Sequence, residues 1–276
     1  MMSNQVTTVI TTDKAVANNE LRLSICLRPN GFSFSMMTLD RTLLTFGEAD
    51  FDFALPMSKL PAAIKSFLTD SNIPTFGCKE VRFIIPSDHT VWIPEHLFDS
   101  SQCRRYIRMI SEPNSRLGVY HALSERQHAY AVFTAPADIV TAFKLALPGI
   151  DAVCQHSLLA NETLSQRSAQ HPVMLMNVRD GNGDYEAFFG QQLLLSNSYP
   201  AKDGNELLYH AIDVMKQLHI ETPDMELLIC GDVGREIFAE LQHYFPNVAL
   251  YTGLPFNYIN PEFQTLHTYR HALLLS

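Results

Sequence analysis

Hydrophobic and polar residues alternate between Leu21 and Arg28, and this period of two predicts a half-buried β-strand. The alternation recurs over 32–36, and a third apolar stretch covers 43–46. Pro29-Asn30-Gly31 separates the first two stretches and predicts a tight turn, because glycine accepts backbone angles that other residues avoid. Three strands joined by short turns predict an antiparallel meander.

A helix and a buried strand follow this meander. Residues 58–68 carry apolar side chains at helical spacing, which predicts an amphipathic helix. Residues 81–85 are mostly apolar, as is typical of a strand in the centre of a parallel sheet. The first part of the chain therefore has the predicted order βββ-α-β.

The same order begins again near Val173. Asp180-Gly181-Asn182-Gly183 predicts a hairpin turn after the first strand of this second unit. The elements predicted are strands over 173–178, 185–189 and 193–196, a helix over 204–218, a strand over 226–230, a helix over 235–244 and a strand over 248–251.

A meander followed by helix and strand alternation predicts a mixed five-stranded sheet of the ribonuclease-H-like plan. Two such units in one chain predict an α/β protein with the duplicated, two-lobed architecture of actin-like ATPases. The repeat lies in the order of the elements and not in residue identity. We predict a flexible N-terminal tail over 1–19, a first lobe over 20–170, and a second lobe over 171–276.

The remaining segments complete the two lobes. Between the units we predict strands over 119–123, 129–134 and 152–156 and helices over 136–147 and 157–168, and after the second unit a final helix over 261–275. The polar stretch 168–171 is the predicted boundary.

Composition narrows the classes of partner. Of the 276 residues, 46% are hydrophobic and 18% are charged, which is typical of a well-packed globular protein. The net charge of −9 disfavours binding to nucleic acid or to anionic lipid. The densest basic cluster, Arg104, Arg105, Arg108 and Arg116, is interpreted as a solvated helix face.

The cysteines and the apolar stretches indicate the compartment. Five cysteines are dispersed without a C-x-x-C pair, which favours reduced thiols over disulfides or a zinc site. No stretch approaches the roughly 18 apolar residues of a membrane span, and the polar N-terminus lacks the pattern of a signal peptide. We therefore predict a cytoplasmic protein without direct membrane insertion.

Five short segments carry a resemblance to a known family. The chain resembles a bacterial family, classified as a domain of unknown function, that has an actin-like ATPase fold. The resemblance covers nearly the whole chain from about Leu21 and supports the fold, because that family has no established activity. Its segments are Val91–Phe98, Leu195–Tyr199, Glu206–His210, Ile229–Asp232 and Tyr244–Val248.

The resemblance implies where nucleotide would bind. Actin-like ATPases hold it between the lobes with two Asp-containing hairpins and a glycine-rich adenosine loop, and each Asp acts through Mg²⁺ or water. Here the first hairpin reads Cys26-Leu27-Arg28 and the second reads Asn177-Val178-Arg179. Both carboxylates are missing, and Pro29 removes a backbone donor. We therefore predict no catalytic residues and degenerate ATP-binding motifs.

Two fragments keep a nucleotide-binding interpretation open. The 180–184 segment is acidic and rich in glycine, although an exposed hairpin turn is the favoured interpretation. Residues 229–234 are similar to an adenosine loop, and equally to an ordinary joint between a strand and a helix, in which Asp232 suits an N-cap. The candidate nucleotide-binding residues are Asn30, Gly31, Asn177, Gly181, Gly183, Gly231, Asp232 and Gly234.

No metal site is predicted, because His267 and His271 share helical spacing but have no third ligand in view. Three functions follow. The first is a non-catalytic scaffold or adaptor that binds a protein partner and no cofactor. The alternative is a nucleotide-binding protein with weakly bound ATP and Mg²⁺ and little or no hydrolysis. The third is a nuclease or transferase, which needs clustered acids that are not evident in the predicted strands.

Overall fold

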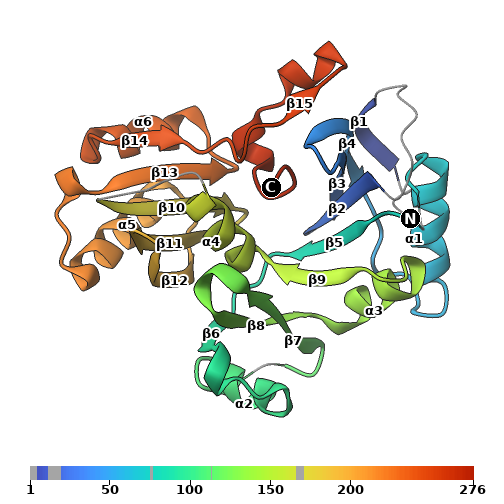
Figure 1. Ribbon diagram of the computed structural model, residues 1–276, viewed down its shortest axis with the longest axis horizontal. Coiled ribbons are helices and arrows are strands. Elements are labelled where there is room, and N and C mark those ends of the chain that lie inside the picture. The colour runs from blue at the N-terminus through green and yellow to red at the C-terminus, as the bar shows by residue number, and fades with distance from the viewer. Residues whose placement is uncertain (1–4, 12–19, 75–76, 113, 166–170) are drawn as a thin grey trace.

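Three β-sheets organise the residues that the structure describes, which are 5–11, 20–74, 77–112, 114–165 and 171–276. The structure is a computed structural model. Figure 1 shows one large sheet in each of two lobes and the small third sheet below them, between the lobes. The predicted boundary over 168–171 falls largely outside the described residues.

The predicted meander forms the middle of the first sheet. Its three strands are paired antiparallel. On its other side, the first strand of the meander pairs in parallel with a fourth strand, which pairs in parallel with a fifth. The strands are β2 (Leu21–Arg28), β3 (Gly31–Thr38), β4 (Thr42–Asp50), β5 (Glu80–Ile85) and β9 (Asp151–Cys154). This order, β4-β3-β2-β5-β9, is the mixed five-stranded sheet that the sequence predicts.

Two additional strands extend this sheet beyond the prediction. β1 (Gln5–Thr11) pairs antiparallel with β4, and β15 (Asn257–Tyr258) pairs in parallel with Thr42 and Leu43 of β4. The prediction of a flexible tail is therefore wrong for residues 5–11. Their content of Val, Thr and Ile favours a strand once a partner edge is available.

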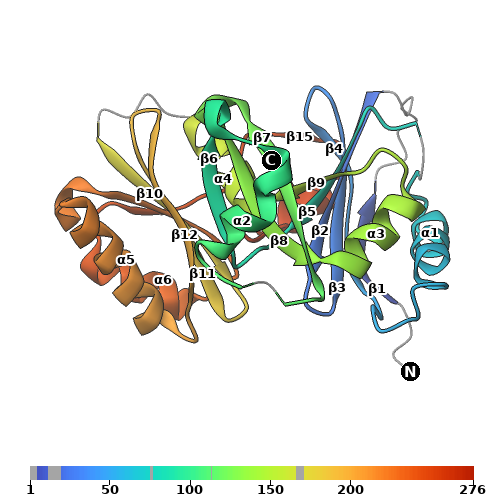
Figure 2. The same cartoon turned by 90° about the horizontal axis from the view of Figure 1, so that it is seen from below.

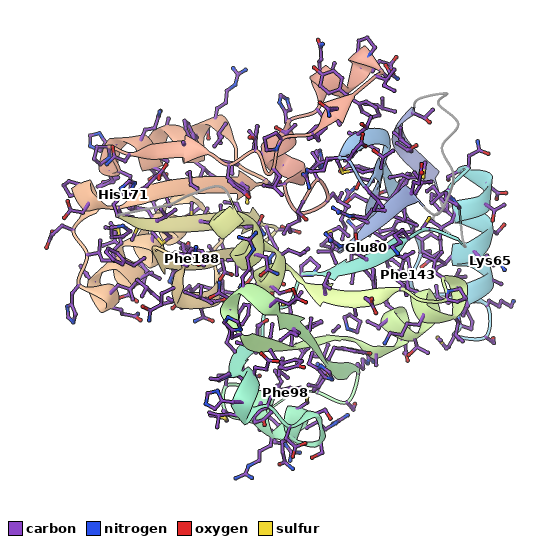
Figure 3. The ribbon with its side chains drawn as sticks, in the orientation of Figure 1. Lys65, Glu80, Phe98, Phe143, His171 and Phe188 are labelled. Atoms are coloured by element: carbon purple, nitrogen blue, oxygen red, sulfur yellow. The ribbon has the colours of Figure 1, made fainter. Side chains whose placement is uncertain are left out.

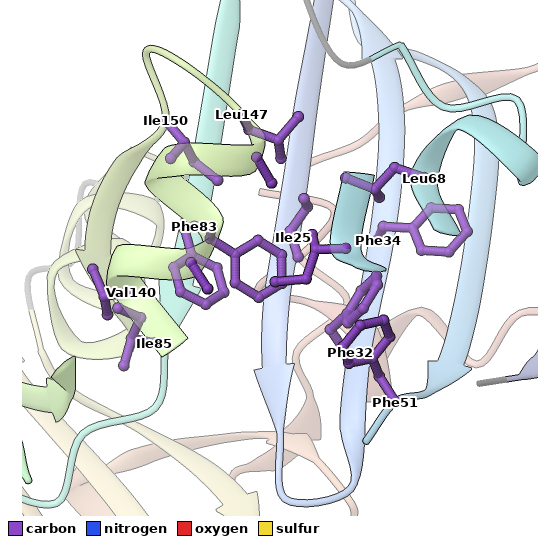
Figure 4. Packing of buried hydrophobic residues seen from close by; sticks show 14 of the residues in the cluster. Ile25, Phe32, Phe34, Phe51, Leu68, Phe83, Ile85, Val140, Leu147 and Ile150 are labelled. Carbon is purple, nitrogen blue, oxygen red and sulfur yellow. The ribbon is translucent and has the colours of Figure 1, made fainter. Parts of the chain in front are cut away.

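Two helices cover one face of the first sheet, and aromatic side chains fill the space between them. α1 (Leu60–Asp70) and α3 (Ala137–Ala146) enclose Phe32, whose ring lies 5.6 Å from that of Phe143. Phe143 is also stacked on Phe83 at 4.3 Å. Figure 4 shows the packing of Phe32, Phe83 and their neighbours. Aromatic pairs at these separations add to the hydrophobic stabilisation of the lobe.

The second lobe repeats the strand order of the first. Its sheet has the order β12-β11-β10-β13-β14, which corresponds to β4-β3-β2-β5-β9. The strands are β10 (Pro172–Arg179), β11 (Asn182–Phe189), β12 (Gln192–Pro200), β13 (Glu226–Gly231) and β14 (Val248–Leu250). The duplication that the sequence predicts is confirmed at the level of sheet topology.

The helices of the second lobe are α5 (Gly204–Leu218) and α6 (Arg235–Tyr244). α5 begins with a reciprocal cap: Asp203 accepts from the backbone N–H of Glu206, and the Glu206 carboxylate accepts from the N–H of Lys202. Its buried face includes Leu207 and Val214, as the apolar spacing predicts. The cap and this face together explain why the helix begins here.

A small third sheet lies between β5 and β9 in the sequence. β8 (Ala129–Pro136) pairs antiparallel with β6 (Thr90–Pro94) on one side and β7 (Leu117–Ser124) on the other. α2 (Cys103–Arg108) packs on this sheet. The sequence predicted β7 and β8 but not β6. Short 3-10 helices cover Glu95–Leu97, Ser100–Gln102, Glu125–Gln127 and Thr222–Asp224.

α4 (Gln155–Ser165) and the C-terminal segment fill the space between the two large sheets. Leu158 of α4 packs with the first lobe, while Leu159 packs with Val173 and other residues of the second. Leu274 and Leu275 likewise belong to the cluster of the first lobe. In Figure 1 the end of the chain, marked C, accordingly lies between the lobes.

The final helix predicted over 261–275 is wrong. The structure has two 3-10 turns, Pro261–Thr265 and Thr268–His271. Side chains of the first lobe donate hydrogen bonds to backbone carbonyl groups near the end of this segment. Ser35 donates to Leu274 O at 2.8 Å, and Arg41 donates to Leu275 O at 2.6 Å. Tertiary contacts therefore outweigh the local helical pattern.

Candidate functional site between the lobes

The candidate site comprises the two hairpins, β2–β3 and β10–β11, the loop after β13, and the polar residues packed between them. In the first hairpin, Arg28 lies 3.4 Å from the Glu48 carboxylate of β4. Burial raises the pKa of the Cys26 thiol to about 12, so this side chain is an uncharged core group. The resemblance to actin-like ATPases implies a carboxylate in this hairpin. The structure has a buried thiol at Cys26 and a paired guanidinium at Arg28 instead.

The turn residues of the first hairpin have structural roles. Gly31 is buried, and a Cβ added there would lie 2.0 Å from the carbonyl oxygen of Ala49. Glycine is therefore required by the close approach of β4. Asn30 is exposed, and its carbonyl accepts from the N–H of Phe51 at 3.0 Å.

In the second hairpin, Arg179 forms a bidentate ion pair with Asp184. Its Nε donates to Oδ2 at 2.8 Å and its Nη2 donates to Oδ1 at 2.7 Å. Asn177 also donates to Asp184 Oδ2, at 2.9 Å. Asp184 is fully buried, and the ion pair supplies the partner that a buried carboxylate requires.

Arg179 also connects the two lobes. Its Nη2 donates to Asp88 Oδ1 at 2.9 Å, and Asp88 lies in the loop that follows β5 of the first lobe. In the same loop, Ser87 N donates to Gln155 Oε1 at 2.8 Å, and Gln155 Nε2 donates back to Ser87 O at 2.7 Å. Gln155 begins α4, so the loop, the linking helix and the second hairpin are joined by one hydrogen-bonded network.

A second buried pair extends this network. His156 Nδ1 and Glu186 Oε1 are joined by a hydrogen bond, and both side chains are shielded from solvent. On the other side of the ring, His156 Nε2 lies 3.0 Å from Ser198 Oγ, which donates to Asp184 Oδ1 at 2.6 Å. Since the serine proton is directed to Asp184, the Nε2–H of His156 donates to the serine oxygen.

This arrangement leaves one proton between Glu186 and His156 Nδ1. Burial alone would lower the pKa of His156, but the Glu186 carboxylate raises it overall. Burial raises the pKa of Glu186 as well. The pair therefore retains its proton and is neutral as a unit, and charge in the interior is balanced without solvent.

Asp184 behaves in the opposite way. Burial alone would raise its pKa, but Arg179 first, then His156 and the Ser198 hydroxyl, lower it overall. The carboxylate is therefore ionised and held by donors from β10, β12 and α4. Such a network stabilises the junction of the lobes.

The loop after β13 is closed by backbone hydrogen bonds. The N–H of Asp232 donates to Val178 O at 2.8 Å, and the N–H of Val233 donates to Gly231 O at 2.9 Å. Gly231 has φ +87°, and a Cβ there would lie 2.1 Å from Val178 O. The glycine thus permits close pairing of β10 with β13.

The remaining candidate nucleotide-binding residues differ in their exposure to solvent. Gly181 is an exposed turn residue with φ +73°, whereas Gly183 is buried and a Cβ there would contact Leu207 at 2.7 Å. Gly234 is exposed at the N-cap of α6, and the carboxylate of Asp232 lies 3.7 Å from Arg270. Close packing explains three of the candidate glycines, Gly31, Gly183 and Gly231, and their binding of nucleotide stays a prediction.

Sequence reasoning missed His156 and Glu186, and its interpretation of 180–184 as an exposed turn is wrong for Asp184, because all three residues are buried at the centre of the network. The available signal was the spacing on β11, where two acidic residues stand two positions apart in a strand whose second half is apolar, and hence share a face. These are the clustered acids that a nuclease would need, but both are fully buried and hydrogen-bonded to protein groups.

The strand order and the paired lobes define a protein with the actin-like ATPase fold. A protein of unknown function from Bacteroides thetaiotaomicron with this fold is similar, with a TM-score of 0.75 and 23% identity over 94% of this chain and 97% of the other. The PilM–PilN type IV pilus biogenesis complex contains a chain similar in fold, with a TM-score of 0.54 and 10% identity over 92% and 96%.

The family model described as "Protein of unknown function (DUF3822)" matches residues 11–248, and the chain belongs to this family. No curated protein matches the sequence. Within the described ranges, no helix has the length and apolar character needed to cross a membrane. Nor do these ranges contain three or more His, Cys, Asp or Glu side chains grouped so that they could hold a metal ion.

Proposed function

We propose that this protein is a non-catalytic scaffold or adaptor that uses its two-lobed shape to bind a protein partner. The observation that supports this proposal is the ion pair between Arg179 and Asp184. Asn177 stands where the resemblance to actin-like ATPases implies the second hairpin carboxylate. The guanidinium of Arg179, two residues later, stands where that resemblance implies a glycine that admits phosphate, and it is already bound on two sides.

The packing between the lobes supports the same function. Leu275 is fully buried and Ala272 is nearly so, and they belong to hydrophobic clusters that join the C-terminal segment to the first and second lobe respectively. The lobes therefore share a buried junction, which suits a rigid binding surface.

A thermal-shift titration with Mg-ATP tests the absence of a nucleotide function. A ligand that binds only the native state at 100 times its Kd adds about 2.7 kcal/mol of stability. We expect no shift of the Tm at millimolar Mg-ATP. A clear shift that disappears in Asp232→Ala would instead support the alternative, a nucleotide-binding protein that uses the loop around Gly231.

Binding of a partner is tested separately. The purified chain, immobilised through a tag, is exposed to native lysate and then to the same lysate after trypsin treatment. We expect stoichiometric capture of a protein from the first and not from the second. Hydrolysis of ATP by the chain at a rate abolished by Asp232→Ala would overturn the non-catalytic proposal regardless of capture.

A further inference from the structure

The small third sheet carries an exposed surface that the network between the lobes does not use. We define the α2 surface by Leu97, Arg104, Arg105, Met109 and Ile110. The side chains of Leu97, Met109 and Ile110 are 63%, 73% and 54% exposed, and Met109 is the most exposed large hydrophobic residue described. Single exposed apolar residues are ordinary in proteins, whereas a group of them marks an interaction surface.

The fold explains why these side chains point to solvent. α2 buries Cys103 and Ile107 against Val132 of β8, which fixes the inward face of the helix. Arg104 and Arg105 therefore lie on the outward side, and Met109 follows one turn after Arg105. Figure 2 shows α2 as the outermost element in front of the small sheet.

The charges of this surface differ from those of the chain as a whole. Among the described residues, Arg104 and Arg105 have no carboxylate partner, while Arg108 is paired with Glu112 at 3.2 Å. Asp99 is used locally, because its carboxylate accepts from the N–H of Ser101. In a chain with a net charge of −9, two unpaired guanidinium groups beside exposed aliphatic side chains form a distinct basic and apolar surface.

We propose that the α2 surface binds an acidic peptide segment of a partner protein, whose carboxylates pair with Arg104 and Arg105 and whose apolar side chains cover Leu97, Met109 and Ile110. This inference rests on the proposed adaptor function and names the surface and the chemistry of the partner. Carboxylates match the planar donors of arginine, and apolar contacts supply the desolvated centre of such an interface.

Other occupants fit this surface less well. The exposed apolar groups are aliphatic, and the neighbouring Phe98 ring is stacked on Tyr130 at 3.8 Å, so free ring faces for nucleic-acid bases are lacking among these residues. Figure 3 places Phe98 beside α2, next to the small sheet. α2 is six residues long, which is short for a helix that lies in a lipid surface.

A random dodecapeptide display library tests the proposal on the whole chain. We expect the selected peptides to be enriched in Asp and Glu together with apolar residues. A synthetic copy of one selected peptide, labelled for fluorescence anisotropy, should bind with an affinity that falls as salt is raised. Arg104→Glu/Arg105→Glu should weaken this affinity by at least about tenfold.

The matched control is Lys59→Glu/Lys65→Glu, which makes the same change of charge at two exposed positions of the first lobe. Lys59 is the N-cap residue of α1, and Lys65 lies within this helix. The control variant should bind the peptide with an affinity within about twofold of that of the wild type. The tenfold loss expected for Arg104→Glu/Arg105→Glu corresponds to about 1.4 kcal/mol of binding free energy. Met109→Ser, which leaves the charge unchanged, should also weaken binding. The Tm of each variant, equal to that of the wild type, shows that the fold is intact.

Several outcomes would overturn the proposal. In the display experiment, they are selection of peptides without acidic enrichment, or of no peptide at all. In the binding experiment, the outcome is equal weakening by the control variant. A different occupant would be shown by cosedimentation with phosphatidylglycerol vesicles or binding of single-stranded DNA, where either requires Arg104 and Arg105, or by dimerisation that Met109→Ser abolishes. Binding and hydrolysis of Mg-ATP would contradict the adaptor function without changing the peptide result, so the two failures are distinguishable.

Discussion

Arg179 of the second lobe and Asp88 of the first lobe are joined by a hydrogen bond of 2.9 Å from Nη2 to Oδ1. The side chain of Asp88 is 55% exposed, whereas Arg179 is 16% exposed and its second partner, Asp184, is fully buried. One guanidinium thus belongs both to an exposed bridge between the lobes and to a buried ion pair. The two contacts differ in solvent screening, and their contributions to stability should differ accordingly.

Arg179→Ala should lower the free energy of unfolding by about 3–5 kcal/mol, because it leaves the Asp184 carboxylate buried without its principal partner. Asp88→Ala should lower it by less than about 1 kcal/mol, because water and salt screen an exposed pair. Urea denaturation of the two variants beside the wild type measures both values. Equal effects would show that the buried and exposed contacts are not energetically distinct.

The fold is predictable because local patterns of apolar, polar and turn residues mark the strands of the two meanders. The alternation over β2 and β3 and the hairpin turn before β11 fix strand and turn positions from neighbouring residues alone. Where tertiary contacts determine the secondary structure, the sequence prediction is wrong. β1 forms because it pairs with the edge of β4. The predicted final helix does not form, and Ser35 and Arg41 donate to carbonyl groups of that segment.

The site was less predictable for a different reason. The loss of carboxylates at both hairpins is visible in the sequence at Cys26 and Asn177. The replacement network is not visible, since His156 and Glu186 are thirty residues apart and meet only when α4 is packed on β11. Long-range pairing of buried polar groups leaves only a weak local signal, here the i,i+2 spacing of Asp184 and Glu186.

The shared proton of His156 and Glu186 predicts loss of stability in alkaline solution. The pKa of His156 is raised above its unfolded value of 6.5, so the folded state binds this proton more tightly than the unfolded state. The stabilisation is fully present below about pH 6.5 and is lost as the pH rises through the folded pKa. The Tm of the wild type should therefore fall as the pH rises above about 6.5.

His156→Gln removes the titrating group and should reduce this slope while lowering the Tm at every pH. His243→Gln is the matched control, because His243 is exposed on α6. The control should retain the slope of the wild type. An undiminished slope in His156→Gln would contradict the assignment of the proton to this pair.

His271 predicts a second effect of the opposite sign. Burial, with help from Arg270 and Arg28, lowers its pKa from 6.5 to about 4. Its ring lies 4.5 Å from that of Phe46, and its side chain is 18% exposed. The stability contributed by the neutral ring is present above pH 6.5 and is lost as the pH falls toward 4, to a total of about 3 kcal/mol.

The free energy of unfolding of the wild type should therefore decline from pH 7 to pH 4 more steeply than that of His271→Gln. Comparing slopes removes the packing cost of the substitution, which is independent of pH. Parallel slopes in the two proteins would mean that His271 is protonated without cost in the folded state.

Gly231 at the end of β13 and Gly234 at the N-cap of α6 should respond differently to alanine. Gly231→Ala places a methyl group against Val178 O at a position with φ +87° and should cost on the order of 2–4 kcal/mol. Gly234 has φ −71° and open space where an added Cβ would lie, so Gly234→Ala should cost less than about 1 kcal/mol. Thermal denaturation of both variants measures the difference, and a harmless Gly231→Ala would contradict the close pairing of β10 and β13.

The contacts of Arg41 predict how the C-terminal segment is held against the first lobe. Arg41 donates to the carbonyl oxygens of Leu254, Pro255 and Leu275, at 3.2, 3.0 and 2.6 Å, and thereby holds both ends of the segment that contains β15. Arg41→Gln removes most of these donors and should cost about 1–3 kcal/mol. Local opening should expose Tyr258 to chymotrypsin, so that cleavage there becomes faster than in the wild type.

Arg235→Ala is the matched control, since Arg235 is an exposed arginine at the start of α6, in the second lobe. Cleavage at Tyr258 in this variant should proceed at the rate of the wild type, as measured by mass spectrometry of timed digests. If Arg41→Gln were also cleaved at the wild-type rate, the hydrophobic burial of Phe263, Leu274 and Leu275 alone would be sufficient to hold the segment, and the arginine contacts would be dispensable.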